Sequence, residues 1–184
     1  MRRRESICRA VCIMMVFSIV FYSYACAQPR DKKVDDMMQE AVRLRQNGQV
    51  DASMQLAKEI MALNPSSAWP HTFISETYQQ QSNLQAALQS SDRAVEVEPK
   101  NAFALRTQAG ILVEMGQHDE ARIAYLKAIE ASDPASADYA FACAGLANVY
   151  LQQGEKSKAK PYIEKALAFE PKNTFFQSLL ARAQ

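Results

Sequence analysis

The sequence has little glycine and almost no histidine. Only 5 glycines and 2 histidines occur among its 184 residues. No glycine-rich loop that could cradle a phosphate is present, and no group of His, Cys, Asp or Glu has the spacing of metal ligands. His71 and His118 are far apart along the chain, and no Ser/His/Asp arrangement accompanies them. The sequence therefore predicts a protein that is not an enzyme and has no catalytic, cofactor or metal site.

A strong net charge is also missing. The 21 Lys and Arg residues nearly balance the 20 Asp and Glu residues. Without the first 27 residues, which contain four arginines and one glutamate, the chain has 17 basic and 19 acidic residues. A surface that binds nucleic acid needs a clear excess of Lys and Arg. We therefore expect no nucleic acid among the partners of this chain.

The first 27 residues differ in kind from the rest. An apolar run over residues 10–24 follows an arginine-rich start, and Ala25 and Ala27 supply the small residues that signal peptidase requires. This pattern predicts a signal peptide over residues 1–27 and a linker over 28–33. If the leader stays uncleaved, its basic start would hold the N-terminus in the cytoplasm and the remainder would still be exported. In both cases the sequence predicts an exported protein.

Cysteine is scarce outside this leader. Cys8, Cys12 and Cys26 lie within it, so the mature chain keeps only Cys143, which we expect to be buried, and no internal disulfide can form. Cys26 has an alternative role, because a bacterial lipoprotein signal ends in small residues before an acylated cysteine, and Ala25-Cys26 fits its last two places. Lipidation of Cys26 would tether the chain through acyl chains, whereas cleavage one residue later would release it. We expect membrane contact only through such an anchor or an uncleaved leader.

One pattern recurs through the rest of the chain. The stretches IMALNP and AVEVEP end at Pro65 and Pro99, which are 34 residues apart, ALAFEP ends at Pro171, and the looser AIEASDP ends at Pro134. Three places counted from these prolines hold small residues in almost every copy: Ala41, Ser75, Ala109 and Ala147; Ser53, Ala87, Ala121 and Ala159; Ile60, Ala94, Ala128 and Ala166. A turn residue stands between the first two places: Gly48, Ser82, Gly116 and Gly154.

These places have a physical meaning. Small residues allow two helices to approach closely, and glycine suits the left-handed residue that ends a helix. Apolar residues recur three or four apart on both sides of the turn, and the proline stops the second helix. Each copy therefore predicts a helix–turn–helix unit.

In this register the chain resembles the tetratricopeptide repeat family. The resemblance implies an all-α fold, a right-handed α-solenoid of about four helix–turn–helix repeats with a C-terminal capping helix, which together form one domain over residues 34–184. The expected boundaries are 34–67, 68–101, 102–135 and 140–173 for the repeats and 174–184 for the cap. Because the fourth repeat starts about four residues late, residues 132–139 predict a longer polar loop between repeats.

The resemblance also implies a binding surface, because the first helices of such arrays line a concave groove. The second residue of each first helix faces this groove, and here that place holds Asp35, Trp69, Phe103, Phe141 and, in the cap, Phe175. Rings supply contact area and amides bond to backbone, which suits an extended or helical peptide. The candidate peptide-binding residues are Trp69, Thr72, Glu76, Gln79, Phe103, Arg106, Val113, Phe141 and Asn148. Alternatively, aromatics at the start of a helix can pack on the preceding repeat as part of the core.

Three further features resemble the pilotins, small tetratricopeptide-repeat proteins of type IV pilus biogenesis. They are the leader that ends near Cys26, the repeat that ends in IEASDP, and the late-starting repeat over residues 136–167. The resemblance implies a non-enzymatic adaptor in the periplasm or at the periplasmic face of the outer membrane, with a secretin subunit as partner. The alternative is a general periplasmic scaffold or chaperone-like protein of another envelope complex.

Overall fold

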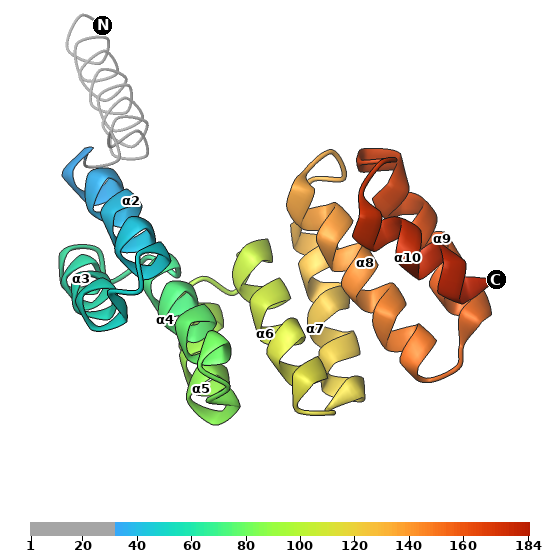
Figure 1. Cartoon of the computed structure of the whole chain (residues 1–184), viewed down its shortest axis with the longest axis horizontal. Helices are drawn as coiled ribbons and strands as arrows, with labels where there is room; N and C mark the ends of the chain where they lie inside the picture. Colours follow the sequence, from blue (N-terminus) through green and yellow to red (C-terminus); the bar gives the residue numbers. More distant parts are fainter. Residues whose placement is uncertain (1–31) are drawn as a thin grey trace, which may run out of the picture.

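The computed structural model describes residues 32–184, and within them the chain forms α-helices and no strand (Figure 1). The helices are α2 (Lys32–Gln46), α3 (Val50–Leu63), α4 (Trp69–Gln80), α5 (Leu84–Val97), α6 (Ala102–Glu114), α7 (His118–Ala131), α8 (Ala137–Gln152), α9 (Lys156–Phe169) and α10 (Thr174–Ala183). The predicted signal peptide and Cys26 lie outside the described residues.

The turns within the pairs form where the sequence predicts them. Gly48, Gly116 and Gly154 have φ angles of 78°, 75° and 77°, and Ser82 has a φ of 60°. Positive φ is the conformation that ends a helix and reverses the chain, and it favours glycine because glycine has no Cβ. Ser82 adopts it without that advantage. The repeat pattern therefore determines the backbone conformation even where glycine is absent.

Short polar residues start several helices. The side chain of Asn83 accepts a hydrogen bond from the backbone N–H of Ala86, and the side chain of Asn101 accepts one from Ala104. Asn173 does the same for the first turn of α10. Each contact satisfies a backbone donor that the helix itself leaves unpaired, so these residues define where the helices begin.

Consecutive helices pack as antiparallel pairs along the long axis of the molecule (Figure 1). We call α2, α4, α6 and α8 the first helices and α3, α5, α7 and α9 the second helices, and α10 follows as an unpaired cap. Direct contacts join α4 to α6, α6 to α8 and α8 to α10, whereas successive second helices within residues 32–184 make no comparable contacts. The array therefore curves toward its first helices, and the predicted all-α solenoid of helix pairs is confirmed.

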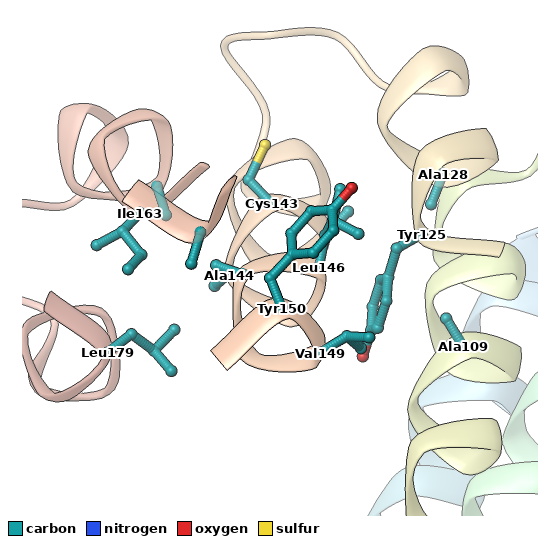
Figure 2. Packing of buried hydrophobic residues seen from close by; sticks show 14 of the residues in the cluster. Ala109, Tyr125, Ala128, Cys143, Ala144, Leu146, Val149, Tyr150, Ile163 and Leu179 are labelled. Atoms are coloured by element: carbon teal, nitrogen blue, oxygen red, sulfur yellow. The ribbon is translucent and has the colours of Figure 1, made fainter. Parts of the chain in front are cut away.

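The core consists of the small residues that the repeat register selects. All twelve residues at the three recurring places have an exposed fraction of 0%. They lie where first and second helices meet, and larger neighbours such as Leu146, Ile163 and Leu179 fill the space around them (Figure 2). Cys143 is buried as expected, and this burial raises the pKa of its thiol.

Large and small residues exchange places between the first and the third repeat interface. At the boundary between the first two repeats, the second helix contributes Ala57 and the next first helix contributes Phe73, and both belong to one buried cluster. At the corresponding places between the third and fourth repeats, the second helix contributes Tyr125 and the next first helix contributes Gly145. One large residue fills each of these two interfaces, but it comes from opposite sides.

The prediction of a loop over all of residues 132–139 is wrong in part, because the last three of these residues are helical. Helix α7 ends at Ala131 and α8 already begins at Ala137, so most of the extra residues form an additional first turn of α8. Ser136 starts this turn, because its hydroxyl accepts a hydrogen bond from the N–H of Tyr139. A similar extension occurs at the start of the array, where α2 begins at Lys32 inside the predicted linker.

Candidate peptide-binding groove

A hollow of about 230 Å³ opens on the face of the first helices. We call the face formed by α4, α6, α8 and α10 the groove. Five of the nine predicted site residues line this hollow: Glu76, Gln79, Arg106, Phe141 and Asn148. They are distant in sequence, and they meet because each occupies an inward place of its own repeat.

Exposed aromatic rings form one wall of the hollow. Phe141 and Phe175 are 37% and 44% exposed, and both line it. The ring of Phe141 meets the buried ring of Phe176 edge-on, with centroids 5.2 Å apart. Large apolar side chains that remain exposed next to polar groups mark interaction surfaces more often than single scattered ones do. The groove therefore offers contact area that the fold itself does not use.

Arg106 contacts one of these rings, that of Phe141, and also the ring of Phe103. Its guanidinium carbon lies 4.9 Å from the centroid of Phe103 and 5.8 Å from that of Phe141, and its Nε is 3.3 Å from Oδ1 of Asp138. Asp138 belongs to the additional turn of α8. The extra residues of the fourth repeat thus supply the carboxylate that orients a groove arginine, and cation–π contacts hold that arginine against the aromatic wall.

The polar residues of the hollow are bound to neighbours. Glu76 Oε2 accepts from Arg45 Nη1 at 3.3 Å, Gln79 Nε2 donates to Glu114 Oε1 at 2.7 Å, and Asn148 Oδ1 accepts from Arg182 Nη1 at 2.8 Å. Each bond connects one repeat to the next repeat or to the cap. Each also uses only part of the hydrogen-bonding capacity of its side chain. The groove therefore keeps polar atoms that can pair with a ligand.

Tyr125 of α7 forms the floor of the hollow, between Gly110 of α6 and Gly145 of α8. Figure 2 shows its ring between Ala109 and Val149. Burial raises the pKa of Tyr125 to about 12, partly offset by the positive charge of Arg106. The hydroxyl therefore keeps its proton and can act as a hydrogen-bond donor throughout the physiological range.

Four predicted site residues lie elsewhere. Trp69 stacks on Phe73, with centroids 5.0 Å apart and planes at 20°, and packs with the apolar cluster of the first two repeats. Thr72 is 1% exposed and its hydroxyl donates to the carbonyl of Ala68. Val113 is half-buried against the main core, and Phe103 lines a separate hollow at the start of α6. We therefore leave Trp69 and Thr72 out of the proposed binding surface, because their side chains serve packing.

The structure also brings residues to the hollow that were not among the candidate site residues. Thr107, Gly110, Tyr125, Gly145 and Phe175 line it as well. Tyr125 comes from a second helix, which is why a pattern built on first helices does not select it. The available signal was the pairing of a large residue in one repeat with a glycine in the next.

The histidines do not form a site in the described part of the chain. His71 lies on the opposite side of α4, in a hollow shared with Tyr78 and Arg93, where burial and the charge of Arg93 lower its pKa. No group of three or more His, Cys, Asp or Glu residues among residues 32–184 is placed to hold a metal ion. Over the same residues, none of the helices has the length and apolar character needed to cross a bilayer.

Comparison with known proteins agrees with this architecture. The sequence model of the tetratricopeptide repeat family matches residues 101–170. The chain is 27% identical over 139 residues to type IV pilus assembly protein PilF of Pseudomonas aeruginosa, an alignment that covers 75% of this chain and 54% of PilF. The chain thus spans about half the length of this curated relative.

Solved structures share the fold. A structure of PilF from Pseudomonas aeruginosa superposes with a TM-score of 0.73 and 23% identity, covering 84% of this chain and 71% of PilF. PilW, described as a widely conserved type IV pilus biogenesis factor, gives a TM-score of 0.74 with 18% identity, covering 83% and 69% of the two chains. MamA gives 0.62 with 23% identity, covering 83% and 85%. The helix pairs, the buried small residues and these matches together show that the chain has the tetratricopeptide-repeat fold, and residues 101–170 match the sequence model of that family.

Proposed function

We propose that this chain is an exported, non-enzymatic adaptor that binds a peptide or helix of a partner protein in the groove. The observation that carries the proposal is the hollow in which Arg106, Phe141 and Asn148 meet beside the exposed ring of Phe175. Aromatic and arginine side chains in such a position are the residue types that dominate the energy of protein interfaces. Repeat folds of this kind typically act as scaffolds, because their function lies in extended surfaces.

We further propose that the partner belongs to type IV pilus assembly and is a secretin subunit. Support comes from the sequence similarity to PilF and from the pilotin-like features of the chain. The predicted leader over residues 1–27 would deliver the adaptor to the periplasm or the periplasmic face of the outer membrane. Acylation of Cys26 would fix it there, and cleavage after Ala27 would leave it free.

A general periplasmic scaffold or chaperone-like protein of another envelope complex is the second candidate. The chain spans only about half of PilF, and MamA has the same fold over 85% of its own length. A groove of this kind could therefore serve another assembly. The identity of the bound partner separates the two candidates.

Affinity capture from envelope extracts tests the proposal. The tagged full chain is expected to retain a secretin subunit, and the double change Phe141→Ala/Phe175→Ala should lower its recovery by about tenfold or more, because buried aromatic anchors are worth roughly 2 kcal/mol each at interfaces. Ile123→Ala/Leu126→Ala is the matched control, since both residues are exposed and lie on the second helix α7.

The control variant should recover as much partner as the wild type. Recovery of a different envelope protein by the wild type, with the same loss in the groove variant, would favour the second candidate. Equal recovery by the wild type and both variants would contradict binding in the groove.

A further inference from the structure

Tyr125 presents a hydroxyl to the groove from the far side of the first helices. Its ring crosses between α6 and α8 because Gly145 has no side chain at that point, where a Cβ would lie 2.3 Å from Cε1 and Cζ of the ring. Only 7% of Tyr125 is exposed, and it lines the hollow. The ring is therefore part of the core, while the oxygen at its tip belongs to the binding surface.

The tyrosine hydroxyl makes no hydrogen bond to any residue between 32 and 184. A Cβ added at Gly145 would lie 2.6 Å from the oxygen and would also strike the ring, whereas a Cβ added at Gly110 would lie 3.9 Å from the oxygen and approach no other atom of the tyrosine. Because neither glycine has a Cβ, the hydroxyl stays accessible from the groove. A polar atom that is largely buried and reachable from one side only gains most from a ligand that pairs with it.

The surrounding atoms restrict what that ligand can be. Asn148 accepts from Arg182 through its oxygen, which leaves its N–H groups as donors, and Gln79 donates to Glu114 through its nitrogen, which leaves its oxygen as an acceptor. With Tyr125, the hollow therefore contains both donors and acceptors. A group with one carbonyl oxygen and N–H donors, which is an amide, can satisfy both.

The size of the hollow and the charges of its lining also favour a side-chain amide. The hollow of about 230 Å³ is smaller than the roughly 300–1,000 Å³ of typical small-molecule sites, so it suits a single side chain of a longer peptide. A carboxylate in it would face Glu76, and Arg106, the basic residue of the lining, is already paired with Asp138. An aliphatic side chain would leave the hydroxyl of Tyr125 without a partner. A neutral side-chain amide avoids both costs.

We propose that the hollow binds an asparagine or glutamine side chain of the peptide partner, and that Tyr125 determines this specificity by donating a hydrogen bond to the amide oxygen. Gln79, which also lines the hollow, would accept from the amide nitrogen, and Gly110 keeps the hydroxyl reachable. The inference rests on the proposed function, and it adds the type of residue that the groove selects.

Panning a phage-displayed library of random 12-residue peptides on the purified full-length chain tests this inference. Enriched peptides should share an asparagine or glutamine, and their affinity can be measured by titration calorimetry with the synthetic peptides. Tyr125→Phe should weaken binding about three- to tenfold, which is the range for one neutral hydrogen bond. Replacing the shared amide residue of the peptide by alanine should weaken wild-type binding by a larger factor than it weakens Tyr125→Phe binding, because the variant has already lost the bond from Tyr125 and can lose only the one to Gln79.

Two further variants make the result specific. Gly110→Ala places a methyl group over the hydroxyl without touching the ring and should also weaken binding, which provides a second route if Tyr125→Phe folds poorly. Tyr162→Phe removes a hydroxyl from α9, outside the hollow, and should bind as the wild type does.

The outcomes separate this inference from the proposed function. Weaker binding of the peptides to the Phe141→Ala/Phe175→Ala variant than to the wild type supports binding in the groove. If such peptides share no asparagine or glutamine, or bind the Tyr125→Phe variant as tightly as the wild type, the amide site would be overturned and groove binding would stand. Enrichment of no peptide, or enrichment of peptides insensitive to the Phe141/Phe175 change, would overturn both.

Discussion

Replacing Phe176 by alanine is expected to lower the free energy of unfolding by about 3–5 kcal/mol, the usual cost of emptying a large aromatic site in a core. Phe176 of the cap helix α10 is 0% exposed and belongs to the main buried cluster, together with Leu179. Its ring also supports Phe141 of the groove. Chemical denaturation followed by circular dichroism at 222 nm measures the loss, and hydrogen exchange should show it largest in α8, α9 and α10, because repeats depend on their nearest neighbours.

The adjacent residue is the control for this prediction. Phe175 is 44% exposed, so Phe175→Ala should cost less than about 1 kcal/mol, since little of its surface is removed from water. If both changes cost the same, the cap helix would be turned differently against α8 than the structure describes. The neighbouring pair therefore tests the rotation of α10 at single-residue precision.

The second large effect is expected at Gly145. A Cβ added there would lie 2.3 Å from two ring carbons of Tyr125 and 2.6 Å from its oxygen. The ring cannot move away cheaply, because Ala109 and Val149 border it (Figure 2). Gly145→Ala should therefore destabilise the protein by about 1–3 kcal/mol, as over-packing of cores does, even though alanine is favoured over glycine inside a helix by about 1 kcal/mol.

Gly110→Ala is the matched change for Gly145→Ala. It makes the same substitution in the corresponding helix of the preceding repeat, but its Cβ would meet Tyr125 only at 3.9 Å, an ordinary contact distance. Its midpoint of thermal unfolding should stay unchanged or rise. A similar fall for both variants would show that the helix backbone, and not the ring of Tyr125, is the reason for glycine.

The repeat register could be predicted from the sequence because its constraints are local and recur. Small residues at three places and a turn residue between them leave few alternatives for the pairing of two helices. The structure accordingly buries every one of those small residues completely and gives every turn residue a positive φ.

The orientation of the aromatic residues could not be predicted in the same way. Trp69 and Phe141 occupy equivalent places, yet Trp69 packs on Phe73 whereas Phe141 remains exposed in the groove. The difference depends on which side of each repeat interface contributes the large residue. Between the first two repeats it is Phe73 of the first helix, which gives Trp69 a ring to stack on. The equivalent place in the fourth repeat is Gly145, so Phe141 has no such neighbour on its own helix.

The residues inserted before the fourth repeat illustrate a second limit. Their Pro and polar composition favours a loop, but Ser136 can start a helix, and α8 extends back to it. This places Asp138 beside Arg106. Residues that were predicted to form a loop thus contribute to the candidate site, because the choice between loop and helix depended on one capping residue.

We propose that the partner binds to the face of α4, α6, α8 and α10. Backbone amide chemical shifts of the ¹⁵N-labelled chain, recorded while a peptide enriched by panning is added, test it most directly. We predict that the largest changes fall on these four helices and centre on Arg106, Phe141 and Asn148. Changes confined to α3, α5 and α9, with these three residues unaffected, would contradict the account.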